Sequence, residues 1–345
     1  MIRRLTHAAL ALVLCLITAC GEKEEPRAGA PPAAKLEPFT LVLDYFPNAD
    51  HAGIYAAQAA GEYRRAGLEL KIQTPPDPAA PLKLLQAGRA DVAISYEPEL
   101  LLARDGGARD LISVAALVQK PLTSIIALGE KKIRSPKDLA GTRVGTAGLP
   151  YQSAYLRTIL AKAGVEVESV KETNVGFNLV PAMLSKRVDA TLGAFWNYEG
   201  VDLARRRRSP SILRVDRLGV PTYAELILAT RADRLDERGA SRIRRFLQAT
   251  ARGHQRLRAD PRTGTDALLA ANRDLDRGLQ EAAVRATLPV FFPEQRGQPF
   301  GYQEPDAWQA YGEWMLANKL VEQQPNAASA LTNEFLPGQG LKPTE

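Results

Sequence analysis

Short apolar runs alternate along this chain with segments in which apolar residues recur at helical spacing. The first run, residues 41–43, ends at a polar and aromatic corner that begins with Asp44. A helix is predicted from about residue 51 to residue 63, and a strand at 68–72 follows the glycine that ends it. Strand, helix and strand in this order are typical of a parallel α/β sheet.

The same alternation continues and then restarts near residue 128, where we expect the chain to leave one lobe for another. Before that point the pattern predicts helices at 80–87 and 99–104 and strands at 90–95, 113–118 and 122–128. After it, the pattern predicts strands at 143–146, 167–171, 188–194 and 212–215, with helices at 151–163, 180–184 and 201–207. A strand at 225–229 returns the chain to the first lobe, which helices at 233–259, 263–271, 274–288 and 305–318 complete.

We therefore expect an α/β fold of two lobes, each a mainly parallel sheet flanked by helices. Lobe 1 comprises residues 39–127 plus 228–325, lobe 2 comprises residues 128–227, and an irregular C-terminal tail spans 326–345. In the helical part, the rings of Trp308, Tyr311 and Trp314 share one face with Met315 and are predicted to lie in the core. His254 is expected on a solvent-facing side of its helix.

The N-terminus has the three parts of a secretory signal. Arg3 and Arg4 precede an apolar stretch at 8–17, and small residues then lead to Cys20. The stretch is shorter than the ~20 apolar residues that a spanning helix needs. We predict a signal peptide at 1–19, of the bacterial lipoprotein kind in which Cys20 is acylated; a plain signal peptide with a coincidental cysteine is the alternative. Residues 20–38, rich in proline, alanine and charge, are predicted to form a flexible tether.

Cysteine content and net charge argue against a disulfide-stabilised protein and against a nucleic-acid-binding protein. The other cysteine, Cys15, lies in the predicted signal, so the mature chain has no disulfide and relies on its core for stability. The formal net charge of +6 becomes +4 once Arg3 and Arg4 are removed, which is weak evidence for a nucleic-acid partner. The arginines at 205–208 are interpreted as a solvated helix end rather than a phosphate site.

Candidate binding residues gather where predicted strands end. In an open α/β sheet, ligands bind outside the carboxyl ends of the strands, beside loops and helix N-termini. The candidates, in chain order, are Asp44, Tyr45, Asn48, His51, Tyr96, Glu97, Gly148, Tyr151, Asn174, Trp196, Glu199 and Tyr223. Structural alternatives remain open at this point: Tyr45 and Trp196 could be core residues, and Glu199 could cap the helix that follows it.

Motifs for catalysis or metal binding are missing from the sequence. It contains no H-E-x-x-H, C-x-x-C, G-x-S-x-G or G-x-x-x-x-G-K-[ST] pattern, and His51 has no histidine partner near the predicted cleft. Carboxylates and aromatic rings remain, and these recognise a ligand without transforming it. We therefore expect a binding protein without a metal or cofactor.

Five segments resemble one family. They are LDYFPNADHAGIY, ADVAISYEPELLLARDGG, VGTAGLPYQSAYL, NVGFNLVPAML and DATLGAFWNYEG, and they are similar to the lipoprotein solute receptors of bacterial ABC importers that take up formylaminopyrimidine, a thiamin pyrimidine precursor. The likeness covers about residues 40–228 closely, and Tyr45 stands where relatives often have tryptophan. Its strand, turn and helix frame is shared with sulfonate, taurine and nitrate receptors.

The resemblance implies a fold and a set of partners. The fold is the two-lobe periplasmic-binding-protein-like fold of type II, with a small aromatic heterocycle clamped between the lobes by hinge closure. The implied partners are an ABC permease and its ATPase, with the protein a membrane-anchored, extracytoplasmic monomer. Tyr45 and Trp196 are expected to stack on the two faces of the ring and Glu199 to accept hydrogen bonds from its amino edge.

A related enzyme provides the rival interpretation. The yeast pyrimidine synthase, which uses pyridoxal phosphate, resembles these receptors but has a lysine and a histidine at the end of its ISYEPE-like segment and a cysteine-rich run further on. In this chain Ser95 and Glu99 stand at the positions of the lysine and the histidine. The segment DRLGVPTYAEL, which contains no cysteine, stands at the position of the cysteine-rich run. The resemblance therefore favours a receptor over the enzyme; receptors for riboflavin, sulfonate or taurine remain alternatives.

Replacing Cys20 by serine tests the predicted anchor. The variant is expected to move from the membrane fraction to the soluble fraction, because the several acyl chains of a lipoprotein hold it on a bilayer and serine cannot be acylated there. The measurement is an immunoblot of carbonate-washed membranes, with Cys15→Ser as the control that stays bound. Retention of the Cys20→Ser protein would show that the anchor lies elsewhere.

Overall fold

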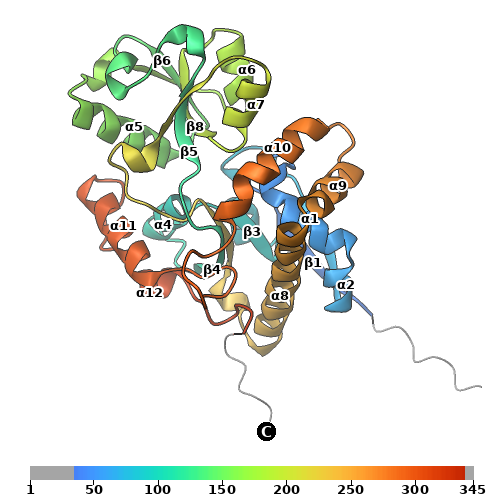
Figure 1. Ribbon diagram of the computed structural model, residues 1–345. Coiled ribbons are helices and arrows are strands. Elements are labelled where there is room, and N and C mark those ends of the chain that lie inside the picture. The colour runs from blue at the N-terminus through green and yellow to red at the C-terminus, as the bar shows by residue number, and fades with distance from the viewer. Residues whose placement is uncertain (1–34, 339–345) are drawn as a thin grey trace, which may run out of the picture. The chain divides into compact units, whose positions relative to one another are not determined.

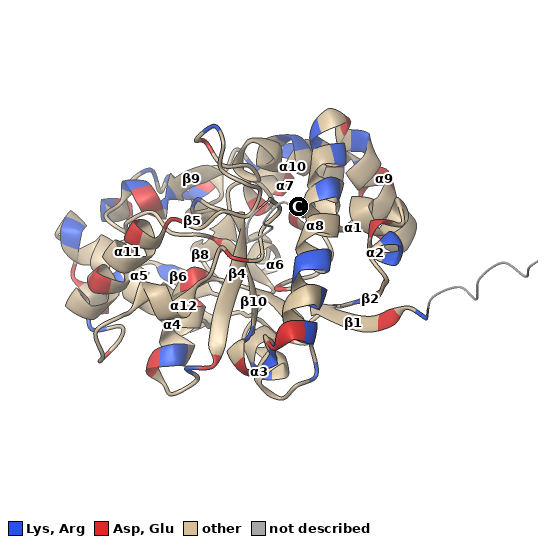
Figure 2. Ribbon diagram, turned by 90° about the horizontal axis from the view of Figure 1, so that it is seen from below, with Lys and Arg blue, Asp and Glu red and all other residues tan. Residues whose placement is uncertain are grey.

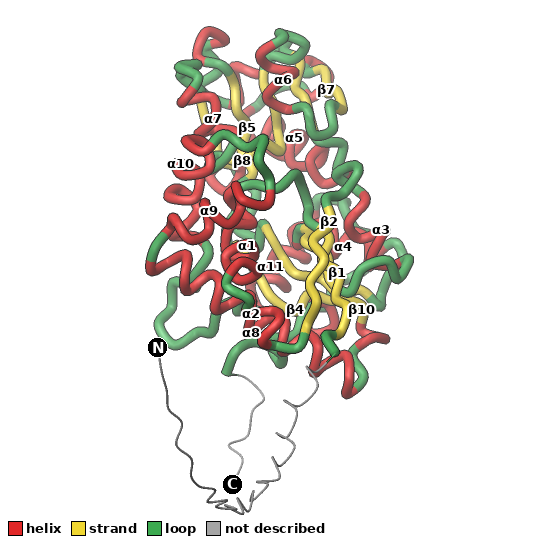
Figure 3. The backbone as a smooth tube through the Cα atoms, turned by 90° about the vertical axis from the view of Figure 1, so that its right-hand side faces the viewer, coloured by secondary structure: helices red, strands yellow, loops and turns green. Residues whose placement is uncertain are grey.

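The computed structural model describes residues 35–338, and within them the chain forms two five-stranded sheets that are covered by helices (Figures 1 and 3). The first sheet has the order β2-β1-β3-β10-β4. Its strands are β1 (Glu37–Val42), β2 (Leu68–Gln73), β3 (Val92–Ser95), β4 (Leu111–Val118) and β10 (Leu226–Arg231). The second sheet has the order β7-β6-β8-β5-β9. Its strands are β5 (Thr123–Ala127), β6 (Arg143–Thr146), β7 (Lys171–Asn174), β8 (Ala190–Phe195) and β9 (Ser211–Arg214).

Both sheets are mainly parallel, as expected, because four strands of each share one direction and only one strand, β10 or β5, runs in reverse. In the first, β1 is parallel to β2 and β3, whereas β10 is antiparallel to β3 and β4. The second repeats this pattern, with β6 parallel to β7 and β8 and with β5 antiparallel to β8 and β9. Helical connections produce the parallel pairs, and the strands that enter from the other lobe run in reverse. We call the first sheet with its helices lobe 1 and the second sheet with its helices lobe 2.

The helices follow most of the predicted ranges. Those of lobe 1 are η1 (Ala49–His51), α1 (Ala52–Ala59), α2 (Glu62–Arg65), α3 (Ala80–Gln86), α4 (Glu97–Asp105), α8 (Glu237–Ala259), α9 (Pro261–Ala271), α10 (Arg277–Thr287), α11 (Pro305–Ala317) and α12 (Ala327–Ala330). Those of lobe 2 are α5 (Pro150–Ala163), α6 (Leu179–Leu184) and α7 (Glu199–Arg205). Short 3₁₀ turns are η2 (Gly129–Lys131), η3 (Pro136–Leu139), η4 (Val167–Ser169), η5 (Val215–Arg217), η6 (Ala232–Arg234) and η7 (Leu288–Val290).

Two predicted elements differ from the structure. The helix expected at 51–63 is divided into α1 and α2 because Gly61, with φ of +71°, adopts a left-handed conformation that interrupts the helix. The strand expected at 167–171 begins only at Lys171, after a 3₁₀ turn.

The first crossover between the lobes lies earlier than predicted. Strand β5 pairs with β8 and β9 of the second sheet, so the chain has already left lobe 1 by Thr123 and not near Leu128. The two apolar runs on either side of Pro121 read alike in sequence, and only their pairing assigns them to different sheets. The second crossover lies between β9 and β10; the range predicted for it, 224–228, overlaps its end and the first residues of β10.

A buried carboxylate joins the two crossovers. Glu225 has no exposed surface and accepts hydrogen bonds from the backbone N–H groups of Leu122 and Thr123, at 2.7 and 2.8 Å. It also accepts from the Thr123 hydroxyl at 2.9 Å and from the Tyr223 hydroxyl at 3.0 Å. Four donors from both crossover segments therefore converge on one side chain at the hinge.

The helical part forms the core as expected at three of four positions. Trp308, Tyr311 and Met315 are buried, and Trp314 is half-buried. His254, however, is fully buried and not on a solvent-facing side. The close packing of α1 against α8 encloses it, and burial lowers the pKa of His254 to about 4, so the ring is neutral.

The predicted irregular tail packs against lobe 1 up to residue 338, with α12 as its one helix in that range. Leu331 forms a parallel bridge to Ser113 of β4, and the N–H of Thr332 donates to the Ser113 carbonyl at 2.9 Å. Phe335 and Leu336 are buried. The predicted signal peptide with Cys20, and most of the predicted tether, lie outside the described residues.

Charged residues of both signs are scattered over the helices of the two lobes (Figure 2). The arginines at 205–207 are exposed, and Arg205, Arg206 and Arg208 pair with carboxylates, in agreement with a solvated helix end. Within residues 35–338, every helix is too short or too polar to cross a bilayer.

Replacing Glu225 by alanine is expected to lower the free energy of unfolding by about 3 kcal/mol or more, because two buried backbone N–H groups lose their acceptor. Urea unfolding followed by circular dichroism measures the change. The control Glu237→Ala, on an exposed position of α8, is expected to change the unfolding free energy by less than about 0.5 kcal/mol. A similarly small loss for Glu225→Ala would show that the hydrogen bonds accepted by Glu225 contribute little to stability.

Candidate functional site

A cleft lies between the two sheets, at the carboxyl ends of β1 and β3 of lobe 1 and of β6 and β8 of lobe 2. Lobe 1 contributes Asp44, Tyr45, Asn48, Asp50, Pro78 and Tyr96 to its lining. Lobe 2 contributes Ala147, Leu149, Tyr151, Gln152, Gly176, Phe177, Leu179, Gly193, Phe195, Tyr198 and Glu199. The volume enclosed is about 30 Å³, close to the space of one water molecule, so the lobes are closed and must part to admit a ligand.

The lining combines carboxylates with aromatic rings. Asp44, Asp50 and Glu199 supply three carboxyl groups, and no lysine, arginine or histidine is among the lining residues. Six rings line the same space, those of Tyr45, Tyr96, Tyr151, Phe177, Phe195 and Tyr198. Such a surface suits a flat ligand that carries N–H donors, and it repels anions.

Asp44 is held from two sides. The Tyr96 hydroxyl donates to Asp44 Oδ2 at 2.9 Å, and His51 Nε2 lies 2.9 Å from Asp44 Oδ1. His51 Nδ1 accepts from the backbone N–H of Asn48 at 3.2 Å, so the ring donates to Asp44 through Nε2–H as the neutral tautomer. His51 is fully buried behind Asp44 and orients it without lining the cleft.

Glu199 combines a structural contact with a position in the cleft. It is the first residue of α7, and its Oε2 accepts from the backbone N–H of Phe195 at 2.7 Å. Burial raises the pKa of Glu199 to about 8, so the carboxyl group is largely protonated at neutral pH. It can therefore donate one hydrogen bond as well as accept others.

Asp50 is a lining residue that was not among the predicted candidates. Its Oδ1 accepts from Asn197 Nδ2 at 2.6 Å and from the Thr287 hydroxyl at 3.1 Å. Burial raises the pKa of Asp50 to about 6. Its place two residues after Asn48, whose side chain caps η1 and accepts from the Asp50 N–H, was the signal that could have revealed it.

The mouth of the cleft is closed by rings from both lobes. The Tyr45 hydroxyl donates to the Phe177 carbonyl at 3.0 Å, and the two ring centroids are 4.7 Å apart with their planes at 87°. Phe46 packs on both rings from outside and is 49% exposed. Phe177 was not predicted as a site residue, although it lies in the resembling segment NVGFNLVPAML.

Trp196 does not line the cleft, which corrects the predicted pairing of Tyr45 with Trp196. Its Nε1–H donates to the Pro121 carbonyl at 3.2 Å, and the Arg214 guanidinium lies 5.0 Å from its ring centroid. Successive side chains of a strand point to opposite faces. Because β8 ends at Phe195 with that side chain in the cleft, Trp196 turns toward the hinge.

Five other predicted residues stand behind the cleft wall or at the hinge; His51 is one of them. Glu97 is buried and accepts from the Ala224 N–H at 2.7 Å, and the Tyr223 hydroxyl donates to Glu225, so both belong to the hinge. Asn174 Oδ1 accepts from the Gly176 N–H at 2.9 Å. A Cβ on Gly148, where φ is +83°, would lie 2.3 Å from Asn174 Nδ2, so these two residues shape the loop that carries Phe177. Asp44, Tyr45, Asn48, Tyr96, Tyr151 and Glu199 are the predicted residues that the cleft brings together.

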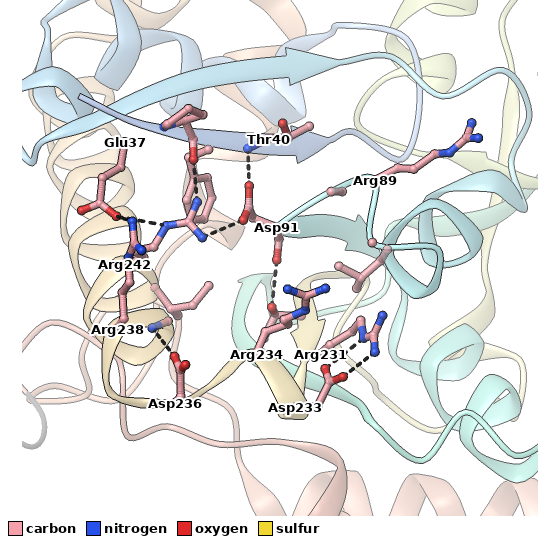
Figure 4. A pocket seen from close by; sticks show the side chains of 18 residues that line it. Glu37, Thr40, Arg89, Asp91, Arg231, Asp233, Arg234, Asp236, Arg238 and Arg242 are labelled. Atoms are coloured by element: carbon pink, nitrogen blue, oxygen red, sulfur yellow. Dashed lines mark hydrogen bonds and ion pairs between the residues drawn. The ribbon is translucent and has the colours of Figure 1, made fainter. Parts of the chain in front are cut away.

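A larger cavity of about 690 Å³ lies at the amino end of β1, away from the cleft (Figure 4). Its charged side chains are largely paired with one another: Arg242 contacts Glu37 and Asp91, and Arg231 contacts Asp233. Among the described residues, no group of histidine, cysteine and acidic side chains is arranged to hold a metal ion. The cleft is therefore the candidate ligand site.

Comparison with known proteins gives a consistent result. A family model described as "NMT1/THI5 like" matches residues 48–264. The formylaminopyrimidine-binding protein of Halalkalibacterium halodurans is 32% identical over 304 residues, which cover 86% of this chain and 90% of that protein. The 4-amino-5-hydroxymethyl-2-methylpyrimidine phosphate synthase of Legionella pneumophila is 25% identical over 299 residues, covering 86% of this chain and 92% of the enzyme.

The fold has solved counterparts. The alkanesulfonate-binding protein SsuA from Xanthomonas axonopodis pv. citri, bound to MOPS, superposes with a TM-score of 0.67 at 20% sequence identity. The match covers 88% of this chain and 99% of that one. The expected two-lobe fold of periplasmic binding proteins is thereby confirmed.

The stability of the protein is expected to fall as the pH rises from about 5 to about 8. Burial raises the pKa of Glu199 from 4.5 to about 8, so the folded protein retains a proton that the unfolded chain releases above pH 4.5. A single group with such a raised pKa lowers the free energy of unfolding by up to about 1.4 kcal/mol for each unit of pH in that interval. Urea unfolding at several pH values measures the slope, which Glu199→Gln is expected to reduce and Glu237→Gln to leave unchanged. Equal slopes in all three proteins would contradict this assignment.

Proposed function

Because the chain belongs to the NMT1/THI5-like family, we propose that it is an extracytoplasmic solute-binding protein that captures a thiamin pyrimidine precursor similar to formylaminopyrimidine. It would deliver this ligand from between its lobes to the permease and ATPase of an ABC importer, acting as a monomer anchored to the membrane through Cys20. The observation that carries the proposal is the chemistry of the cleft, with three carboxyl groups, six rings and no cationic side chain in its lining.

The ligand class follows from this chemistry. An aminopyrimidine presents a flat ring, an exocyclic amine that donates and ring nitrogens that accept. Glu199, largely protonated at neutral pH, can donate to a ring nitrogen while it accepts from the neighbouring amine. Tyr45 and Phe195, one from each lobe, are placed to contact the ring faces, with Phe195 in the role first expected for Trp196. Asn48 and Tyr151 remain for the substituent.

An anionic ligand fits less well. A sulfonate needs arginine, lysine or an array of N–H groups, and buried carboxylates oppose it. SsuA, whose fold this chain shares, binds an alkanesulfonate, but a shared fold does not transfer its ligand. The lining residues therefore favour the pyrimidine.

A binding role is also favoured over the synthase reaction. At the positions where the resemblance places the lysine and histidine of the enzyme, Ser95 donates to Glu99 Oε2 at 2.6 Å. Neither residue forms a Schiff base with pyridoxal phosphate. The hinge segment that would hold the cysteine-rich run contains Tyr223 and Glu225 instead, and the Tyr223 hydroxyl donates a hydrogen bond to Glu225. We propose that the protein releases its ligand unchanged.

Isothermal titration calorimetry against formylaminopyrimidine, riboflavin, taurine and nitrate tests the proposal. We expect binding of the pyrimidine alone, with a Kd of about 1 μM or lower, equivalent to about −8 kcal/mol. Glu199→Gln is expected to weaken it by about tenfold or more, and the matched surface change Glu237→Gln to leave it unaltered. Mass spectrometry of the recovered ligand, after incubation with pyridoxal phosphate, is expected to show no chemical change. Tight binding of taurine without binding of the pyrimidine, or an altered product, would overturn the proposal.

A further inference from the structure

Lobe 2 contacts helix α10 of lobe 1 through polar side chains. Asn197, in the turn between β8 and α7, donates to Asp50 Oδ1 at 2.6 Å and to the Thr287 hydroxyl at 2.7 Å. Gln280 Nε2 lies 3.3 Å from the Tyr198 hydroxyl, and Arg205 lies 3.3 Å from Asp276 Oδ1. We call this set of contacts between residues 197–205 and α10 with Asp50 the closure seam.

The seam follows one face of α10. Asp276, Gln280 and Thr287 are separated by four and seven positions, which places them on the same side of a helix. The opposing residues of lobe 2 come from residues 197–205, which comprise the turn after β8 and helix α7. The contacts therefore run along the boundary between the lobes and not inside either of them.

The composition of the seam suits a contact that must open. Asn197, Gln280 and Thr287 are fully buried, yet Asn197 Oδ1 and Gln280 Oε1 have no hydrogen-bond partner within the described residues. When the lobes part, water can satisfy these oxygens and replace the broken hydrogen bonds. An apolar seam of the same size would instead resist opening, because it would expose apolar surface to water.

One member of the seam also reaches the ligand cleft. Asp50 lines the cleft, while Asn197 and Thr287 do not. Asn197 thus connects lobe 2 to a carboxylate that a ligand would touch from the other side. A ligand that fixes Asp50 in this orientation would favour the closed arrangement of the lobes.

We propose that Asn197 is the positioning residue of a closure latch, which forms only when the lobes meet and which sets how long the ligand is retained. The identity of the retained ligand rests on the proposed function. The effect of Asn197 on lobe closure is independent of that function. Opening breaks the hydrogen bonds of Asn197 to Asp50 and to Thr287, so loss of the latch acts on ligand dissociation. Association starts from the open form and is largely independent of it.

Stopped-flow fluorescence with formylaminopyrimidine tests the latch in the full-length protein. Asn197→Ala is expected to raise the dissociation rate constant by about tenfold and to leave the association rate constant within about threefold. Asn197→Asp, which sets two carboxyl groups face to face, is expected to raise it further. Thr287→Val removes one partner and is expected to have a smaller effect in the same direction, and the matched exposed change Thr263→Val is expected to have none.

Small-angle X-ray scattering without ligand provides a second readout that requires no pyrimidine. The Asn197 variants are expected to have a larger radius of gyration than the wild type, because the open form becomes more populated. An unchanged radius together with an unchanged dissociation rate would overturn the latch, even if Asn197→Ala lowers the melting temperature. Absence of pyrimidine binding by the wild type would overturn the proposed function, and the scattering comparison would still decide on the latch. If Asn197→Ala fails to fold, Thr287→Val with its Thr263→Val control decides in its place.

Discussion

The arrangement of the two lobes depends on the buried carboxylate of Glu225. Two segments of chain pass between the lobes, residues 119–122 and residues 215–225. Glu225 accepts two backbone N–H groups of the first crossover and stands itself in the second, with Tyr223 completing the set. The orientation of both sheets at the cleft follows from this hinge, because β5 and β10 start directly beyond it.

The hinge and the cleft both contain carboxyl groups that are costly to bury; Glu97 and Glu225 lie at the hinge, and Glu199 lines the cleft. Burial raises the pKa of Glu97, Glu199 and Glu225 to about 7 or 8, and none of them has a cationic partner among the described residues. A carboxyl group with a raised pKa is protonated to a larger extent at neutral pH and so avoids part of the cost of a buried charge. A neutral carboxyl group offers a donor and an acceptor side by side, which an ionised one does not.

Much of the fold could be predicted from the sequence, and the reasons for the errors are physical. Periodicity identified most strands and helices, and the principle that ligands bind at the carboxyl ends of strands identified Asp44, Tyr45 and Glu199. It could not tell which of Phe195 and Trp196 faces the cleft, since that depends on the residue at which β8 ends. Nor could it assign β5 to the second sheet, because pairing with β8 and β9 is a tertiary choice. Asp50 and Phe177 were missed because their roles arise from contacts between the lobes.

The order of the strands in the two sheets also determines when each lobe can be completed during synthesis. All five strands of the second sheet come from one continuous stretch, between Thr123 and Arg214. In the first sheet, β10 lies between β3 and β4, so β4 has no place in that sheet until residues 226–231 have been made. Contacts across such long sequence separations form slowly. The lobe that begins first along the chain is consequently the one that is finished last, and lobe 2 is a folded insert around which lobe 1 assembles.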